Sequence, residues 1–351
     1  MSHTIAVYGA TGHTGRHVTT ELRRRGHHPL LLGRDLTTLH TLDDHPRHAT
    51  VDDPDSLDRA LHGADAVINT AGPFATTAGP LIDAARRAGI PYLDVAAEIE
   101  ANLDTFTHHT DATTLIIPAM AFYGGLGDLL ATTALDGDTH ADTIHIAYGL
   151  TSWHPTPGTL ASGTVSTQRR GGRRLRYTNG ALHHHDDAPT TVTWPFPPPL
   201  GPREVLAEFT MADVVTLPTH LRAHHITTYM TTTAATDLAN AGPRRDTPET
   251  FTVDVLIRTG TTQRRITATG QDIYAISAPL VVEATDRVLT GRTRVTHGVA
   301  SAGTAFDAPD FLRSLHTHLT IHHHKPISGT PTAPFPASDR GTAPLTPSTR
   351  N

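Results

Sequence analysis

The sequence contains no cysteine and only one lysine, Lys325, among its 351 residues. The absence of thiols excludes disulfide bonds, thiolate metal ligands and cysteine nucleophiles. The sequence also lacks the run of roughly 18 or more apolar residues that a membrane span needs. Its first residues enter a strand-like stretch at once, without the basic and long apolar segments of a secretory signal. We therefore expect a soluble, cytoplasmic protein.

Charged residues are also few, at 18% of the chain, and the formal net charge is −6. The chain therefore has no strong basic field for a nucleic acid, and we expect a small-molecule substrate instead. Arginines do gather at Arg169, Arg170, Arg173 and Arg174. Such a group suits either an acidic substrate or carrier, or a solvated face of a strand.

Histidine, in contrast, is abundant, with 26 copies. The densest groups, 183–185 and 322–324, are consecutive in sequence. Side chains alternate in direction along a strand, so consecutive histidines cannot all reach one ion without a special backbone. Ligands at helical or turn spacing would be a stronger signal. We interpret the excess as a trait of composition and expect no metal site.

The first 135 residues alternate short apolar runs with helical segments, a pattern typical of a parallel sheet with helices on both faces. Strands are expected at 4–9, 29–33, 49–52, 65–72, 90–96 and 113–119. We therefore predict a Rossmann-type, doubly wound α/β domain over residues 1–135 that binds a dinucleotide.

The pattern changes after residue 135 to longer alternating strands, which indicate a mostly antiparallel sheet with one wet face. Strands are expected at 142–150, 173–182, 251–260 and 264–275, and helices at 159–168, 217–230, 279–289 and 309–319. We predict a second, α+β domain over residues 136–322 for substrate binding and dimerisation, whose last helix is free to pack back on the first domain. Residues 323–351 are rich in Pro, Thr, Ser and Gly and are expected to be a disordered tail.

A glycine-rich segment, GATGHTG, directly follows the first strand and opens a helix. Gly9 allows a tight turn, Gly12 lets the backbone approach a pyrophosphate, and Gly15 allows the helix to pack closely on the strand. The alternative is a strand-to-helix turn without a ligand. The residues predicted to hold the dinucleotide here are Gly9, Thr11, Gly12, His13, Thr14 and Gly15.

The ends of the second and third strands carry residues that discriminate dinucleotides. An acidic residue accepts from a ribose 2′-hydroxyl, whereas an arginine pairs with a 2′-phosphate. Because Arg34 precedes Asp35, the sequence favours NADP(H); alternatively, Arg34 is solvated and Asp35 caps the next helix. Asp52 is expected near the adenine, and its neighbour Asp53 can equally cap the helix after Pro54.

The fourth strand ends in NTAGPF, which is expected beside the ribose and nicotinamide through Ala71, Gly72, Pro73 and Phe74. After the next helix comes AGIPYLDVAAE, whose Glu98 either positions cofactor or substrate or caps the following helix. These two segments resemble the saccharopine dehydrogenase-like NADP-binding oxidoreductases, including the group of trans-acting enoyl reductases. Further similarity at 117–131, 156–166, 270–291 and 298–315 extends the resemblance to about residue 320.

The resemblance implies that the first domain binds NADP(H), and that the second forms the substrate pocket on a sheet that often supports a homodimer. One segment departs from the family. Tyr123, Gly124 and Gly125 stand where relatives commonly have an acidic or polar residue and a proline. The substrate specificity of the relatives therefore cannot be inferred for this chain from these three residues.

The single lysine limits the chemistry. Short-chain dehydrogenases use a tyrosine and a lysine four residues later, but the residue four before Lys325 is Ile321. Schiff-base chemistry requires a lysine as well. The remaining candidates for a catalytic proton donor are Tyr123, which alternatively packs at the domain junction, and His154, which is alternatively a loop histidine.

The sequence thus predicts an NADPH-dependent reductase that transfers hydride to a polarised C=C or C=N bond. The resemblance to enoyl reductases implies a polyketide, a lipid-like molecule or another intermediate of secondary metabolism as substrate, free or carrier-bound. The alternative is a non-redox cyclase or isomerase on the same fold, in which the dinucleotide is structural or absent.

Overall fold

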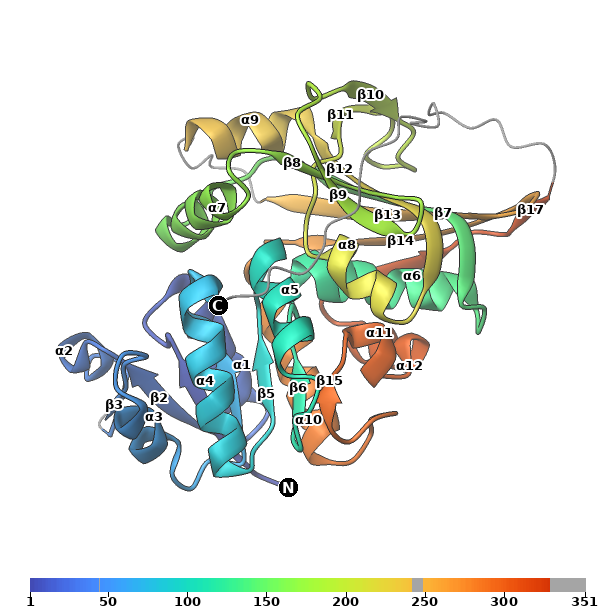
Figure 1. Ribbon diagram of the computed structural model, residues 1–351. Helices are drawn as coiled ribbons and strands as arrows, with labels where there is room; N and C mark the ends of the chain where they lie inside the picture. Colours follow the sequence, from blue (N-terminus) through green and yellow to red (C-terminus); the bar gives the residue numbers. More distant parts are fainter. Residues whose placement is uncertain (44, 242–248, 329–351) are drawn as a thin grey trace.

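The computed structural model describes residues 1–43, 45–241 and 249–328, which form two sheets. In Figure 1 the first sheet lies in the lower half of the molecule and the second in the upper half. The first sheet has seven strands in the order β15-β6-β5-β4-β1-β2-β3, and every pair is parallel. This confirms the predicted Rossmann-type sheet.

The strands of the first sheet are β1 (Thr4–Tyr8), β2 (His28–Gly33), β3 (Arg47–His48), β4 (Ala66–Asn69), β5 (Tyr92–Asp94), β6 (Leu115–Ile117) and β15 (Gly298–Val299). The helices that connect or follow them are α1 (His13–Arg24), α2 (Leu36–Leu39), α3 (Pro54–Leu61), α4 (Phe74–Ala88), α5 (Ile99–His108), the short η1 (Phe122–Leu126) and α6 (Gly127–Leu135).

Strand β1 illustrates why the sheet is buried on both faces. Ile5 and Val7 belong to the core that includes α1 and α10, whereas Ala6 and Tyr8 belong to the core that includes α3 and α4. Successive side chains of a strand point to opposite faces, so a strand covered by helices on both sides must be apolar throughout. The uninterrupted apolar runs of the sequence are the consequence.

The second sheet has ten strands in a mixed arrangement. Its main order is β10-β11-β12-β7-β13-β14-β16, and β12 and β7 are parallel while the other pairs are antiparallel. Its strands are β7 (His140–Leu150), β8 (Arg174–Thr178), β9 (Ala181–His185), β10 (Thr191–Trp194), β11 (Arg203–Ala207), β12 (Arg222–Thr231), β13 (Thr250–Thr259), β14 (Thr262–Gln271), β16 (Thr320–His323) and β17 (Ile327–Ser328). The remaining helices are α7 (Pro157–Arg169), α8 (Asp213–Thr216), η2 (Leu217–Thr219), α9 (Thr232–Asn240), α10 (Ser277–Leu289), α11 (Ala302–Ala305) and α12 (Ala308–Ser314).

The predicted helix at 217–230 is wrong. Only the short η2 lies there, and residues 222–231 form β12 in the middle of the second sheet, between β7 and β11. The β-branched residues Ile226, Thr227 and Thr228 favour this extended conformation. Pairing with two distant strands therefore overrode an apolar spacing that is also compatible with a helix.

Further boundaries differ from expectation, and the strand expected at 173–182 is a hairpin of β8 and β9. The third strand covers Arg47–His48 instead of 49–52, because the chain turns after Ala49 toward the cap of α3. Part of the expected tail joins the second sheet, since β17 pairs with β14. The rest of that tail, residues 329–351, lies outside the described residues.

The chain returns to the first sheet after building the second. Helix α10 packs along α1, and β15 pairs with β6 at the edge of the parallel sheet. The sequence division placed these residues with the second domain. Helices α11 and α12 pack on α6, which in turn packs against β13 and β14, so the C-terminal third links the two sheets.

A buried ion cluster joins α1 to α10. Arg25 directly follows α1, and its guanidinium donates to Glu21 (2.7 Å) on α1 and to Glu283 (2.6 Å) and Asp286 (2.8 Å) on α10. The Arg25 side chain is 16% exposed, and the two glutamates are 8% and 7% exposed. Arg25 bonds all three carboxylates, so its removal would leave them close together, largely shielded from water and with one counter-charge fewer.

Arg25→Ala should lower the free energy of unfolding by about 3 kcal/mol, the cost typical of breaking a buried pair. Arg24→Ala is the matched control, because Arg24 binds the same Glu21 but its side chain is 58% exposed. That variant should lose at most about 1 kcal/mol. Urea unfolding of both variants measures the difference, and equal losses would contradict a special role for the α1–α10 cluster.

Candidate dinucleotide and substrate site

A cavity of about 1210 Å³ lies along the carboxyl edge of the first sheet and extends to the second sheet. The carboxyl ends of parallel strands meet at one edge, so loops distant in sequence line the same space. The residues of the first domain predicted from the sequence that line it are Gly9, Thr11, Gly12, His13, Thr14, Arg34, Ala71, Gly72, Phe74, Glu98 and Tyr123. Four other predicted residues lie outside this lining: Gly15, Asp52, Pro73 and His154.

The glycine turn has the geometry of a phosphate cradle. Gly9 has a φ of +84°, and a Cβ added there would lie 2.8 Å from the Cβ of Ala71. A Cβ at Gly15 would lie 2.3 Å from the carbonyl oxygen of Gly9, so its role is packing rather than lining. No side chain caps the amino end of α1 at Gly12. The first-turn amides are therefore positioned to bind an anion.

Arg34 and Asp35, the two charged residues that follow β2, have different surroundings. The Asp35 carboxylate caps α2, where it accepts from the Thr38 amide at 3.1 Å and from the Thr38 hydroxyl. These hydrogen bonds hold the pKa of Asp35 below its usual value. Arg34 is exposed, lines the cavity, and makes no hydrogen bond or ion pair with the residues that the structure describes. After β3, Asp53 caps α3 through the Ser56 amide.

Glu98 caps a helix, but not the one that follows it. Its Oε1 accepts from the Phe74 amide at 2.7 Å and its Oε2 from the Ala75 amide at 3.0 Å, at the start of α4. Its carboxylate thus fixes the NTAGPF turn from the neighbouring strand end. The side chain is buried and lines the cavity, so Glu98 shapes the site through the backbone that it holds.

Sequence reasoning missed Asp94, although it lies in the YLDVAAE motif. Its Oδ1 accepts from the amides of Ala96 (3.0 Å) and Ala119 (2.8 Å), which ties the end of β5 to the segment that leads to Tyr123. Burial raises the pKa of Asp94 to about 6. Its Oδ2 accepts from the Tyr92 hydroxyl at 2.9 Å. A buried acid within a strand is the signal that could have identified this role.

Tyr123 lies where the cradle meets the second domain. Its ring centroid is 4.8 Å from those of Phe122 and Tyr148 and 5.6 Å from that of Trp153. The side chain is 6% exposed, and the hydroxyl has no hydrogen-bond partner among the described residues. Burial raises the pKa of Tyr123 well above its usual value, so the phenol stays protonated. The ring packs at the domain junction, as the alternative prediction has it, and it also lines the cavity, so a catalytic role of the hydroxyl stays a prediction.

The glycines beside Tyr123 are required by close packing. Gly124 has a φ of +91°, and a Cβ there would lie 2.9 Å from the Cβ of Ala119. A Cβ at Gly127 would lie 2.0 Å from Oδ1 of Asp213. Asp213 is fully buried and accepts from the Tyr148 hydroxyl at 2.8 and 2.9 Å. Burial raises the pKa of Asp213 to about 7. Close packing on Ala119 thus requires Gly124 of the departing segment, and Gly127 beyond it leaves room for a buried carboxyl group that the sequence did not reveal.

His154 is turned away from the cavity. Its Nε2 lies 3.4 Å from Oε1 of Glu249, and its side chain is 17% exposed. The neighbouring Trp153 does line the cavity, and its Nε1 donates to the Tyr274 hydroxyl at 3.0 Å. Thr159 at the start of α7 also bonds that hydroxyl, at 2.8 Å. The Tyr274 hydroxyl is therefore occupied by protein partners, unlike that of Tyr123.

The wall farther from the cradle is mainly apolar. Its apolar residues are Leu175, Leu206, Phe209, Met211 and Leu238. Two arginines on this wall have close protein partners: Arg170 pairs with Glu100 at 3.0 Å, and Arg174 donates to the carbonyl oxygens of Ala207 and Glu208 at 3.0 and 3.2 Å. A third, Arg173, is 47% exposed and lies 3.6 Å from the exposed carboxylate of Asp186. This end of the cavity therefore offers apolar contact together with two engaged cations and one exposed cation.

Residues 9–117 match the family model described as NAD(P)H-binding, so this part of the chain is a nicotinamide dinucleotide-binding domain. No curated protein matches the sequence. Apo saccharopine dehydrogenase (L-Glu forming) from Saccharomyces cerevisiae aligns with a TM-score of 0.65 at 11% identity, over 92% of this chain and 100% of that one. This likeness shows the fold, and it confirms the saccharopine dehydrogenase-like architecture that the motifs predicted.

Two other solved structures match over smaller parts of the chain. An epimerase from Bacteroides thetaiotaomicron aligns at 18% identity over 33% of this chain and 70% of its own, with a TM-score of 0.30. A short-chain dehydrogenase/reductase from Veillonella parvula in complex with NADP aligns at 23% identity over 28% and 48%, with a TM-score of 0.25. These scores are too low to support an argument about function.

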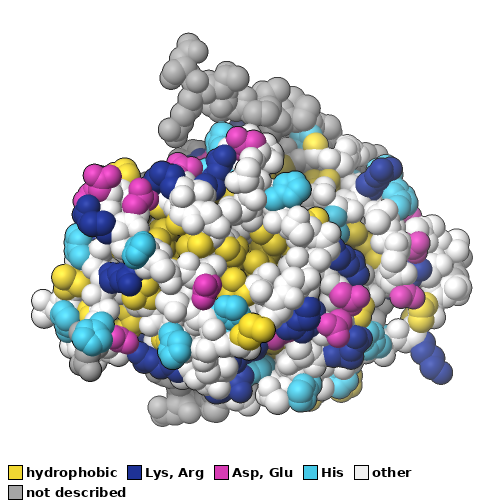
Figure 2. Space-filling model, turned by 90° about the horizontal axis from the view of Figure 1, so that it is seen from below, with side chains coloured by type: hydrophobic (Ala, Val, Ile, Leu, Met, Phe, Trp, Pro, Cys, Tyr) yellow, Lys and Arg dark blue, Asp and Glu magenta, His cyan; other side chains and the backbone are white. Residues whose placement is uncertain are grey.

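The molecular surface agrees with the charge balance of the sequence. On the face shown in Figure 2, basic, acidic and histidine side chains are interspersed. That face therefore carries no broad basic patch of the kind that binds a nucleic acid backbone. In the described part of the chain, no helix combines the length and apolar character needed to cross a bilayer.

Asp213 should make stability depend on pH. The folded pKa of Asp213, about 7, lies above that of an unfolded carboxyl group. Its contribution to the free energy of unfolding is therefore fully present below about pH 4 and is lost as the pH rises through 7. Asp213→Asn keeps an acceptor for Tyr148 and removes the titration. Between pH 5 and pH 8, the wild type should lose about 2 kcal/mol more than this variant in urea unfolding. Parallel profiles would contradict the raised pKa.

Proposed function

We propose that this protein is an NADPH-dependent reductase that transfers hydride to a polarised C=C or C=N bond of a small, largely apolar biosynthetic intermediate. The observation that carries the proposal is the buried hydroxyl of Tyr123. It lacks a partner among the described residues, and the residue that carries it lines the same cavity as the glycine turn. A buried donor without an acceptor is rare in proteins, and a substrate atom would satisfy it.

The choice of NADP(H) rests on Arg34 and Asp35. The Asp35 carboxylate, which would accept from a 2′-hydroxyl, is engaged in capping α2. The Arg34 guanidinium at the cavity is available for a 2′-phosphate. The glycine turn and the amino end of α1 would hold the pyrophosphate. When bound, the reduced dinucleotide supplies the hydride.

Tyr123 has the properties of a hydrogen-bond donor to the substrate. Its raised pKa keeps the phenol neutral, so it can donate to a carbonyl oxygen or an imine nitrogen and withdraw electrons from the reacting bond. The electron-poor carbon accepts the hydride. A proton from solvent joins the other atom of the double bond, which completes a two-electron reduction. His154 has no part in this step, since it lies outside the cavity lining.

The cavity wall supports an apolar substrate. Phe209, Met211 and Leu238 offer apolar contact, while Arg170 and Arg174 are engaged with protein acceptors. A substrate carboxylate would have to displace those acceptors or bind the exposed Arg173, whereas a polyketide or lipid-like chain needs neither. This property, together with the resemblance to enoyl reductases, favours such a substrate over an amino acid.

Arg34→Ala should weaken NADPH binding about tenfold or more and leave NADH binding unchanged, because it removes only the partner of the 2′-phosphate. Fluorescence titration with both dinucleotides measures the two affinities. Arg59→Ala, whose side chain on α3 is 71% exposed, is the matched control and should bind both as the wild type does. Equal losses for NADPH and NADH would contradict this role of Arg34.

Tyr123→Phe should lower kcat/KM about 100-fold, the usual cost of losing one donor to a developing negative charge, with NADPH affinity within twofold of the wild type. The assay follows NADPH consumption with a panel of enones and cyclic imines. Tyr177→Phe in β8 and His154→Ala, both outside the cavity lining, should retain full activity.

Two results would reject the proposal. An unchanged kcat/KM in Tyr123→Phe would remove the assigned role of the hydroxyl. Tight NADPH binding without consumption on any enone or imine would favour the non-redox cyclase or isomerase.

A further inference from the structure

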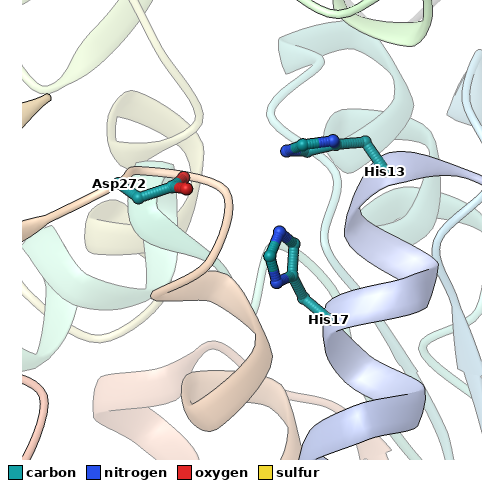
Figure 3. Close-up of side chains that lie close together, drawn as sticks. All are labelled: His13, His17 and Asp272. Atoms are coloured by element: carbon teal, nitrogen blue, oxygen red, sulfur yellow. The ribbon is translucent and has the colours of Figure 1, made fainter. Parts of the chain in front are cut away.

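Three potential metal ligands lie close together beside the glycine turn, and none of them belongs to the groups of consecutive histidines in the sequence. They are His13 and His17 on α1 and Asp272 in the turn after β14, and their ligand atoms all lie within 4.8 Å of one another. Figure 3 shows the two imidazoles and the carboxylate directed toward the space between α1 and this turn. The group joins the dinucleotide-binding domain to a segment that leaves the second sheet.

Local structure explains why these side chains converge. His13 and His17 are four residues apart, so they stand on the same face of α1, one turn from each other. Asp272 has a φ of +53° in a tight turn, and its Oδ1 accepts from the amides of Tyr274 and Ala275, both at 3.0 Å. These bonds fix the carboxylate and leave its Oδ2 without a hydrogen bond to the described residues.

We propose that His13, His17 and Asp272 form a binding site for zinc or a similar divalent transition metal ion. Two imidazole nitrogens and one carboxylate oxygen are a ligand set that zinc accepts, with water in the fourth position. Ligand atoms held tetrahedrally at about 2 Å from an ion lie roughly 3.3 Å apart. Small side-chain rotations therefore close the site, since no backbone element has to move far.

A second group, His140, Asp142 and His224, also brings ligand atoms within 4.8 Å. It lies on the neighbouring strands β7 and β12, and both of its histidines are exposed, whereas in the first group only His13 is exposed. The Asp142 carboxylate is held by one backbone amide, that of Gly260 at 2.7 Å, whereas two amides hold Asp272. This group is the weaker candidate, and it provides a control of the same composition.

The proposed ion would hold elements that border the cofactor site in place and would not itself contact the cofactor. His13 lines the cavity, and its ring centroid is 5.2 Å from that of Tyr274, which holds the start of α7 through its hydroxyl. An ion at this site would fasten α1 to the turn that carries Tyr274. We therefore expect it to stabilise the junction between the two sheets and to leave the reacting groups untouched.

The test uses the full chain after treatment with a chelator. Zinc affinity is measured by competition with a chromogenic chelator for the wild type, His17→Ala, Asp272→Asn and the control His224→Ala. His17 is chosen because it does not line the cavity, and asparagine at 272 preserves both the turn and the acceptor for the amides. We expect one tight equivalent in the wild type and His224→Ala, and at least tenfold weaker binding in the other two variants.

Two further measurements exclude a folding artefact. Thermal unfolding without metal should give similar Tm values for all four proteins, and zinc should raise Tm in the wild type and His224→Ala only, because it binds the folded state. Cobalt(II) bound to the wild type should show absorption bands that His17→Ala lacks. Equal zinc affinity of the wild type and both site variants would overturn the site, as would a loss confined to His224→Ala.

Discussion

The candidate site depends on a contact between two backbone turns that leaves no room for a side chain. The glycine turn after β1 approaches the turn after β4 so closely that a Cβ at Gly9 would lie 2.8 Å from the Cβ of Ala71. This approach brings the amino end of α1 and the NTAGPF turn to the same cavity. Because α1 is in turn bound to α10 through Arg25, the cradle is also connected to the C-terminal third of the chain.

Buried carboxyl groups hold the loops around that contact. Glu98 binds the first amides of α4, Asp94 ties the end of β5 to the segment before Tyr123, and Asp213 packs against Gly127 from the second domain. Each acid supports backbone or a tyrosine hydroxyl instead of facing the cavity as a free charge. The site therefore gains its shape from buried hydrogen bonds, which are strong only when every partner is in place.

The sequence predicted the parallel sheet and the glycine turn because their signals are local. A strand buried on both faces must be apolar, and a turn in which backbone comes close to a phosphate and a helix packs closely on a strand needs glycine at fixed spacing. The strand β12 was missed because its identity depends on pairing with β7 and β11, which are remote in sequence. Local spacing cannot distinguish a helix from such a strand.

The same limit applies to the site residues. Arg34, Asp35 and Asp53 follow strand ends, so their roles could be anticipated from position, but the direction in which Glu98 caps a helix could not. Neighbouring residues in sequence gave no means of ranking Tyr123 against His154. The tertiary packing distinguishes the two residues, since Tyr123 lines the cavity and the His154 imidazole lies next to Glu249. The i to i+4 spacing of His13 and His17 is a local signal, but Asp272 joins them only through the tertiary fold.

The protonation state of Tyr123 bears on the choice between a reductase and an isomerase. An isomerase needs a base that removes a proton from the substrate, whereas a reductase needs a donor that withdraws electrons as the hydride arrives. Burial raises the pKa of Tyr123, which favours the protonated phenol at neutral pH. Asp213, the nearby buried acid, is already bonded to Tyr148 and is separated from the lining. Tyr123 is thus suited to donate and not to accept a proton, and this property favours the reductase.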